Sequence, residues 1–172
     1  YHDQLQDTLD KKEFPALTYT KNLQDWGDFI RRTPDEYEDW INKVTEECAI
    51  IELKILNELV KKNKKIFVDT NIPVSMLKKI SDKDHVLIML TDPNESVNRF
   101  FDRPDLEKQF LYQLLLKEEN PDLAIENFKN CLKRINSIEN YNKFYTSGFN
   151  VLIKDESRSI DETLQIVEKY FK

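Results

Sequence analysis

The chain of 172 residues carries a net charge of −6, with 40% hydrophobic and 34% charged residues. This composition predicts one folded domain and argues against global disorder, and no apolar run reaches the roughly 18 residues that a membrane span needs. The acidic balance argues against a nucleic-acid-binding protein. Two cysteines without a C-x-x-C pattern fit a reducing compartment. We therefore expect a cytoplasmic monomer or homodimer that contacts neither nucleic acid nor membrane.

Helix-start signals are clear at several places along the chain. Residues 33–36 (Thr-Pro-Asp-Glu) form a capping box with proline at the first helical position, and apolar residues recur behind it at helical spacing as far as Leu59. Similar starts occur at residues 92–95, 120–122 and 159–162. Helices are therefore predicted to dominate the fold.

Three short apolar segments, residues 66–68, 85–90 and 149–153, are predicted to be strands. Strands that are apolar on both faces are typical of a parallel sheet covered by helices. A helix is predicted after each of the first two strands, which indicates βαβ units. The sequence thus predicts an α/β fold in a single domain, with a helical region at 1–63 and a helical excursion at 94–144.

Ligands of open α/β sheets bind beyond the carboxyl ends of the strands, which makes Asp69 a candidate site residue. Asp69 ends the first predicted strand, where a carboxylate can hold a magnesium-bound water or accept a proton from a substrate hydroxyl. Asp69, Thr70 and Asn71 are also good turn formers, so a turn or helix cap is the alternative interpretation.

Arginines near aromatic residues give two further candidate sites. Arg99 and Arg103 are four residues apart and could clamp a phosphate by paired hydrogen bonds. A surface pair balanced by neighbouring aspartates is the alternative. Trp26, Arg31 and Arg32 could line a cleft for an anionic or ring-containing substrate, although anchoring of Trp26 in the core is the simpler interpretation.

Four segments also carry a family resemblance: residues 26–37, 68–73, 97–103 and 144–149. Together they resemble bacterial P-loop kinase-like proteins related to the shikimate and nucleoside-monophosphate kinases. The resemblance implies an ATP- and Mg²⁺-dependent phosphotransferase acting on a small hydroxyl-bearing metabolite, built on a parallel sheet of strand order 2-3-1-4-5. A kinase-like binding or scaffold protein without phosphate-loop activity is the alternative, and a purely helical interaction module is a third hypothesis.

The resemblance implies roles for the candidate residues. Asp69 would lie on the magnesium and substrate side, and Arg99 and Arg103 would belong to a lid over the ATP phosphates. Arg158 could stack on adenine. The phosphoryl acceptor would face Trp26, Arg31, Arg32 and Asn71. His2 and Asp3 would follow strand two.

The sequence departs from this family at the phosphate-binding loop. Gly27 and Gly148 are its two glycines, and no G-x-x-x-x-G-K-[ST] pattern occurs. In the family this loop and the first strand precede the position of Tyr1, which implies roughly 30 to 40 further residues. Strand one would lie between strands three and four, and its removal would leave backbone groups on both neighbours without partners. We expect either that the natural protein has this segment or that the sheet rearranges.

Overall fold

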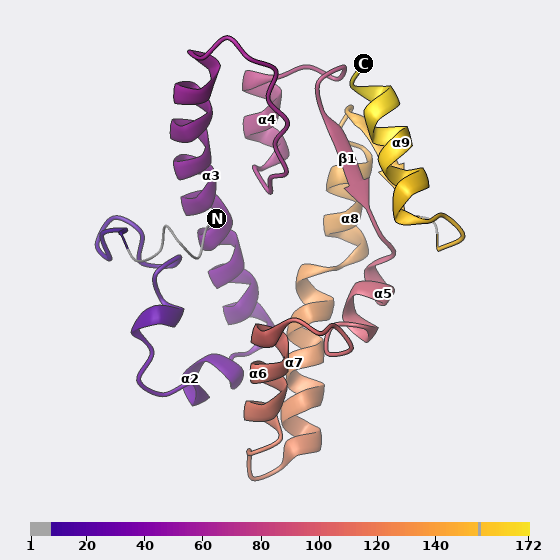
Figure 1. The fold of residues 1–172 in the computed structure, drawn as a ribbon. Helices are drawn as coiled ribbons and strands as arrows, with labels where there is room; N and C mark the ends of the chain where they lie inside the picture. Colours follow the sequence, from indigo (N-terminus) through magenta and orange to yellow (C-terminus); the bar gives the residue numbers. More distant parts are fainter. Residues whose placement is uncertain (1–7, 155) are drawn as a thin grey trace.

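A computed structural model describes residues 8–154 and 156–172, and this part of the chain is mainly helical (Figure 1). The 3-10 helix η1 (Thr20–Asn22) precedes the α-helices, which are α2 (Gly27–Ile30), α3 (Pro34–Val60), α4 (Val74–Ile80), α5 (Pro93–Asn98), α6 (Leu106–Leu115), α7 (Pro121–Ile135), α8 (Ile138–Tyr145) and α9 (Ile160–Tyr170). The strands are β1 (Leu87–Leu90) and β2 (Asn150–Ile153). None of the helices in the described ranges has both the length and the apolarity needed to cross a bilayer.

The helix starts confirm the capping signals of the sequence. Thr33 begins α3 in a capping box, since its hydroxyl accepts from the Glu36 N–H at 3.3 Å and the Glu36 carboxylate accepts from the Thr33 N–H at 2.8 Å. Ser159 begins α9 with the same box, and Asp92 and Asn120 cap α5 and α7. Residues 94–144, expected to form a helical excursion, contain α6, α7 and most of α5 and α8.

The largest core cluster joins the N-terminal half of α3 to its neighbours α2, α5, α6 and α7. Its buried members are Phe29, Ile30, Tyr37, Val97, Leu115, Phe128, Cys131 and Leu132. Aromatic rings meet edge-on inside it, with centroids 5.0 Å apart for Phe29 and Trp40 and 5.7 Å apart for Tyr37 and Phe128. Such packing fixes α2 against the start of α3, which is the region that contains the candidate site.

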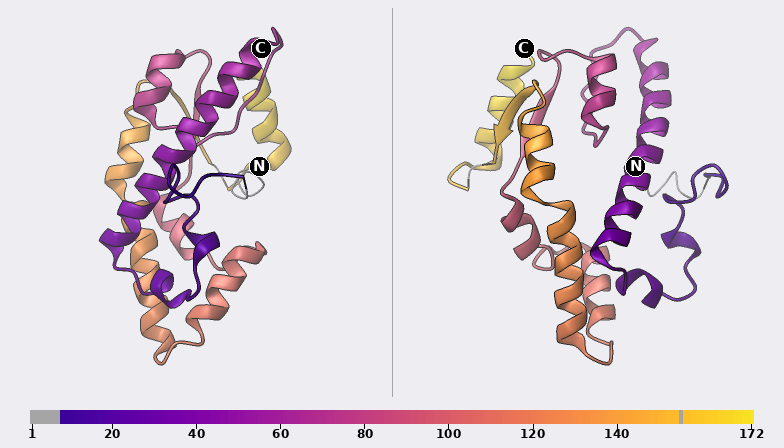
Figure 2. Two further views of the ribbon diagram at one scale, coloured as in Figure 1. Left: turned by 90° about the vertical axis from the view of Figure 1, so that its left-hand side faces the viewer. Right: turned by 180° about the vertical axis from the view of Figure 1, so that it is seen from behind.

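The predicted sheet is wrong in its extent. β1 and β2 pair in parallel, with Leu87 opposite Asn150 and Leu90 opposite Ile153, and the described residues contain no further strand. Figures 1 and 2 show this small sheet and α9 on the side of α8 that faces away from α3. An α/β fold of order 2-3-1-4-5 needs a larger central sheet, so the structure corrects it to a helical fold with one parallel pair.

Residues 66–68, predicted as a strand, are coil. Phe67 is 66% exposed, and its ring contacts that of Phe171 at 5.8 Å between centroids. Lys65 Nζ donates to the Phe171 carbonyl at 2.7 Å. The segment thus runs beside the end of α9 without a strand partner, and an apolar run without a partner cannot satisfy its backbone as a ladder.

Candidate functional site

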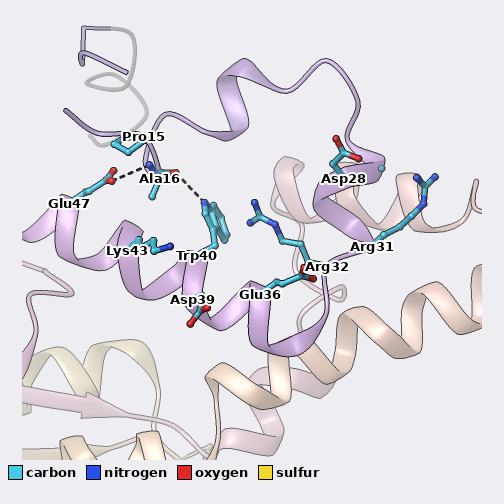
Figure 3. Close-up of a pocket in the computed structure, with 11 residues that line it drawn as sticks. Pro15, Ala16, Asp28, Arg31, Arg32, Glu36, Asp39, Trp40, Lys43 and Glu47 are labelled. Atoms are coloured by element: carbon cyan, nitrogen blue, oxygen red, sulfur yellow. Dashed lines mark hydrogen bonds between the residues drawn. The ribbon is translucent and has the colours of Figure 1, made fainter. Parts of the chain in front are cut away.

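An open cleft of about 700 Å³ lies between the N-terminal segment, α2 and the first half of α3. This volume is within the range of about 300–1,000 Å³ that is usual for small-molecule sites. Charged side chains dominate the lining, which includes three cations and four carboxylates: Arg31, Arg32, Lys43, Asp28, Glu36, Asp39 and Glu47. Figure 3 shows the arrangement.

Two side chains of α3 hold the N-terminal wall of the cleft in place. The Glu47 carboxylate accepts from the backbone N–H groups of Ala16 at 3.1 Å and Leu17 at 2.8 Å. Trp40 Nε1 donates to the Ala16 carbonyl at 3.1 Å. These three hydrogen bonds, two of which are drawn in Figure 3, close one side of the cleft over α3. Hydrogen bonds to a charged carboxylate are stronger than neutral ones, so this wall is firmly attached.

The backbone of Arg32 is anchored where α2 gives way to α3. Its carbonyl accepts from Asn127 Nδ2 at 2.9 Å and from the Cys131 thiol at 3.4 Å, both on α7. Arg32 is therefore tied at its main chain to α7, which contributes three buried residues to the core, while its side chain extends into the cleft beside Trp40 (Figure 3).

The guanidinium of Arg32 packs against aromatic rings and is not paired with a carboxylate of the described residues. Its central carbon lies 4.3 Å from the centroid of the Tyr19 ring, 5.2 Å from that of Trp40 and 5.3 Å from that of Phe29. Its Nη1 atom is buried and has no hydrogen-bond partner, and the side chain forms no ion pair with any described residue. Ring stacking occupies the faces of a guanidinium and leaves the N–H groups at its edge available to an acceptor.

Arg31 behaves differently although it is adjacent in sequence. Its Nε donates to Glu118 Oε2 at 2.8 Å and its Nη2 donates to Glu118 Oε1 at 3.0 Å, which is a bidentate ion pair with the α6–α7 connection. The hydrogen bond to Glu118 and the charge of that carboxylate raise the pKa of Arg31. Figure 3 shows Arg31 directed away from Arg32. Arg31 lines the cleft but is already engaged.

The remaining charges of the cleft divide into engaged and free groups. Glu36 accepts from Thr33, whose backbone and side-chain hydrogen bonds lower the pKa of Glu36, and Glu47 holds the N-terminal wall. Lys43, Asp28 and Asp39 form no hydrogen bond or ion pair with other residues in the described parts of the chain. The cleft therefore presents charge of both signs without hydrogen-bond partners, although the charge of Asp28 also acts on Arg31.

Several predicted site residues lie outside the cleft. Trp26 packs in the core, with its ring centroid 5.7 Å from that of Phe29 and 5.2 Å from that of Phe110, as the simpler interpretation held. Asp69 and Asn71 are exposed on the coil between α3 and α4. The predicted sites of His2 and Asp3 lie outside the described residues.

The predicted lid arginines are not brought together with the cleft either. Arg99 Nη1 donates to Glu95 at 2.9 Å and to Glu156 at 3.3 Å, and Lys154 lies 3.0 Å from Glu156, so Arg99 is part of a balanced ion-pair network. Hydrogen bonds with Glu156 and with Arg99 lower the pKa of Glu95 to about 2. Arg103 is exposed between α5 and α6. The side chain of Arg158 donates to the Ile153 carbonyl at the end of β2.

The described residues contain no cluster of metal ligands. Within ranges 8–154 and 156–172, no group of three or more His, Cys, Asp or Glu side chains is placed to hold a metal ion. Hard divalent cations need several oxygen ligands, and Asp69 is a single exposed carboxylate. The predicted ATP and Mg²⁺ sites therefore stay predictions.

Trp40 and Lys43 are cleft residues that the sequence did not reveal. Trp40 falls within the apolar spacing that follows Thr33, and it packs partly against the core. The signal was a second periodicity: Glu36, Trp40, Lys43 and Glu47 follow one another in steps of four, three and four, which places them on one face of a helix. A face that mixes an indole with both charge signs differs from a uniformly solvated one.

Comparisons with protein-family models, with curated proteins and with solved structures gave no match for this chain. The chemistry of the cleft is therefore the basis for assigning a function.

Proposed function

We propose that this chain is a small-molecule-binding domain and that its ligand places an oxyanion, a carboxylate or a phosphate, against Arg32. The observation that carries the proposal is the buried Nη1 of Arg32, which lacks an acceptor while the residue lines a cleft of about 700 Å³. A buried donor without a partner costs about 1–3 kcal/mol, more when it is charged. Protein atoms cover Nη1 in the ligand-free protein, so a small shift of the Arg32 side chain brings the guanidinium to a ligand oxygen, which then offsets that cost.

The surroundings of Arg32 favour a bound oxyanion. The rings of Tyr19, Trp40 and Phe29 restrict the guanidinium, so less side-chain entropy is lost when a ligand binds. The aromatic surface also lowers the local dielectric, which strengthens a charge-assisted hydrogen bond. Lys43 contributes a second, more exposed cation to the same cleft.

The two tryptophans make a direct test possible. Trp40 lines the cleft and Trp26 does not, so in proton–nitrogen correlation spectra the indole signal of Trp40 reports binding and that of Trp26 serves as an internal control. Titration with inorganic phosphate and with acetate should shift the Trp40 signal saturably. Arg32→Met should weaken binding by about tenfold to a hundredfold, the equivalent of losing a hydrogen bond to a charged group.

Two further variants sharpen this test. Arg32→Lys keeps the charge but loses the planar fork, so it should recover only part of the affinity. Lys43→Met should weaken binding about two- to fivefold, as expected for an exposed charge, whereas Lys62→Met on the distant polar run should leave it unchanged. Unchanged anion affinity in Arg32→Met, with the Trp26 signal intact as evidence of folding, contradicts the proposal.

ATP-dependent phosphotransfer to a hydroxyl-bearing metabolite remains a second proposal. Its support is that Arg31 and Arg32, expected to face the phosphoryl acceptor, both line the cleft. ADP release from ATP and Mg²⁺, dependent on an added metabolite and reduced in Arg32→Met, is the expected result. Ligand binding without any ADP release favours the non-catalytic binding role. Both proposals place the protein in the cytoplasm, where the free thiols of Cys48 and Cys131 stay reduced.

A further inference from the structure

The cleft around Arg32 carries uncommitted charges of both signs. Arg32 and Lys43 are cations without an acceptor, and Asp28 and Asp39 are carboxylates without a donor, among the residues that the structure describes. All four line the same cleft. A ligand of one charge sign would leave half of these groups unused or would be repelled by them.

The overall charge of the lining limits the ligand further. Four carboxylates face three cations, and Arg31 is already neutralised by Glu118 at 2.8 Å. A ligand with several negative charges would therefore meet net repulsion, since like charges brought together in a partly desolvated site cost free energy. A ligand that is neutral overall but carries separate charges meets no such penalty.

We infer that the ligand of this cleft is a small zwitterion, a compound with a carboxylate and an ammonium group such as a free amino acid. This inference rests on the proposed oxyanion site and extends it: the carboxylate binds the guanidinium of Arg32, and the ammonium binds one of the two free carboxylates, Asp28 or Asp39, which Figure 3 shows on opposite sides of Arg32. The indole of Trp40 and the ring of Pro15 supply apolar surface for the remainder of the ligand.

Three probes that share one side chain separate the contributions. Phenylalanine carries both charges, N-acetylphenylalanine only the carboxylate, and phenethylamine only the ammonium. Followed through the Trp40 indole signal, phenylalanine should bind at least about tenfold more tightly than either of the others, because each charged contact contributes on the order of a factor of ten. Equal affinity of phenylalanine and N-acetylphenylalanine overturns the inference.

Variants of the two carboxylates give an independent result. Asp28→Asn combined with Asp39→Asn should weaken phenylalanine about tenfold and leave N-acetylphenylalanine unchanged or tighter, since the repulsion on its carboxylate falls. Asp84→Asn, an exposed aspartate outside the cleft, is the matched control and should change neither.

The outcomes distinguish the inference from the proposed function. If phosphate and acetate shift Trp40 but phenylalanine has no advantage over its acetylated form, the oxyanion site stands and the zwitterion assignment is wrong. If neither phosphate, acetate nor any of the three probes shifts Trp40, both are wrong. Preference for phenylalanine that disappears in the double variant supports both.

Discussion

Arg31 and Arg32 have the same side chain and adjacent positions, yet the structure gives them different tasks. Arg31 forms a bidentate ion pair with Glu118, which lies 87 residues further along the chain. Arg32 is supported by aromatic rings and keeps a buried donor without a partner. The sequence predicted both as ligand contacts because nothing local distinguishes them. The difference depends on which distant residues the fold brings near each guanidinium.

Tyr37 offers a prediction at the scale of one side chain. Burial in the core, followed by the charge of Cys131, raises its pKa to about 12, while the nearby Arg32 lowers it slightly. Because the pKa is higher in the folded state, the contribution of the neutral Tyr37 phenol to the free energy of unfolding is fully present below about pH 10. It is lost as the pH rises through about 12. Tyr37→Phe removes the ionisable group, so near pH 12 it should be more stable than the wild type by roughly 2–3 kcal/mol.

The measurement is denaturant unfolding at neutral pH and at increasing alkaline pH, with tyrosinate absorbance recorded in parallel. The phenol of Tyr37 makes no hydrogen bond with a described residue, so the two proteins should differ little at neutral pH. Tyr145→Phe, which alters a phenol on a residue that is 51% exposed, is the matched control and should not gain this alkaline advantage. Parallel loss of stability in wild type and Tyr37→Phe would show that the buried phenol is not responsible.

At the scale of elements, helices were predictable and strands were only partly so. Four consecutive residues are enough to define a helix start, as in the capping boxes at Thr33 and Ser159. The capping residue and the glutamate that bonds back to it lie on the same short segment. A strand exists only with a partner elsewhere. Residues 87–90 pair with residues 150–153, whereas residues 66–68, which are equally apolar, have no strand partner and remain coil.

The same limit explains how much of the candidate site was predictable. Arg31 and Arg32 were recognised from residue type, because clustered guanidinium groups beside aromatics suit anions. Trp40 and Lys43 were not, because the apolar spacing of this helix already accounts for Trp40 as a core residue and no local signal separates Lys43 from an ordinary surface lysine. The predicted sheet would have brought the ends of its strands to one edge. Because the described residues form only a two-stranded sheet, no such edge brings Asp69, Arg99 and Arg103 together with the cleft.

At the scale of the whole molecule, burial is uneven. The cluster around Phe128 contains four of the five largest fully buried side chains among the described residues and joins α2, α3, α5, α6 and α7. The region of α4, the sheet and α9 buries little, and Met89 on β1 is 60% exposed. Stability should therefore depend mainly on the cluster that also supports Arg32, because free energy of folding follows the apolar area removed from water.

Two phenylalanines test this distribution. Phe128 is 1% exposed and its ring contacts those of Tyr37, Phe100 and Phe101, so Phe128→Ala should lower the free energy of unfolding by about 3–5 kcal/mol. Phe67→Ala removes the same atoms from an exposed ring and should cost at most about 0.5 kcal/mol. Denaturant unfolding followed by tryptophan fluorescence measures both, since Trp26 and Trp40 pack against the cluster. Comparable losses in the two variants would mean that the ring of Phe67 is buried in solution. The stability of the protein would then not depend mainly on the cluster around Phe128.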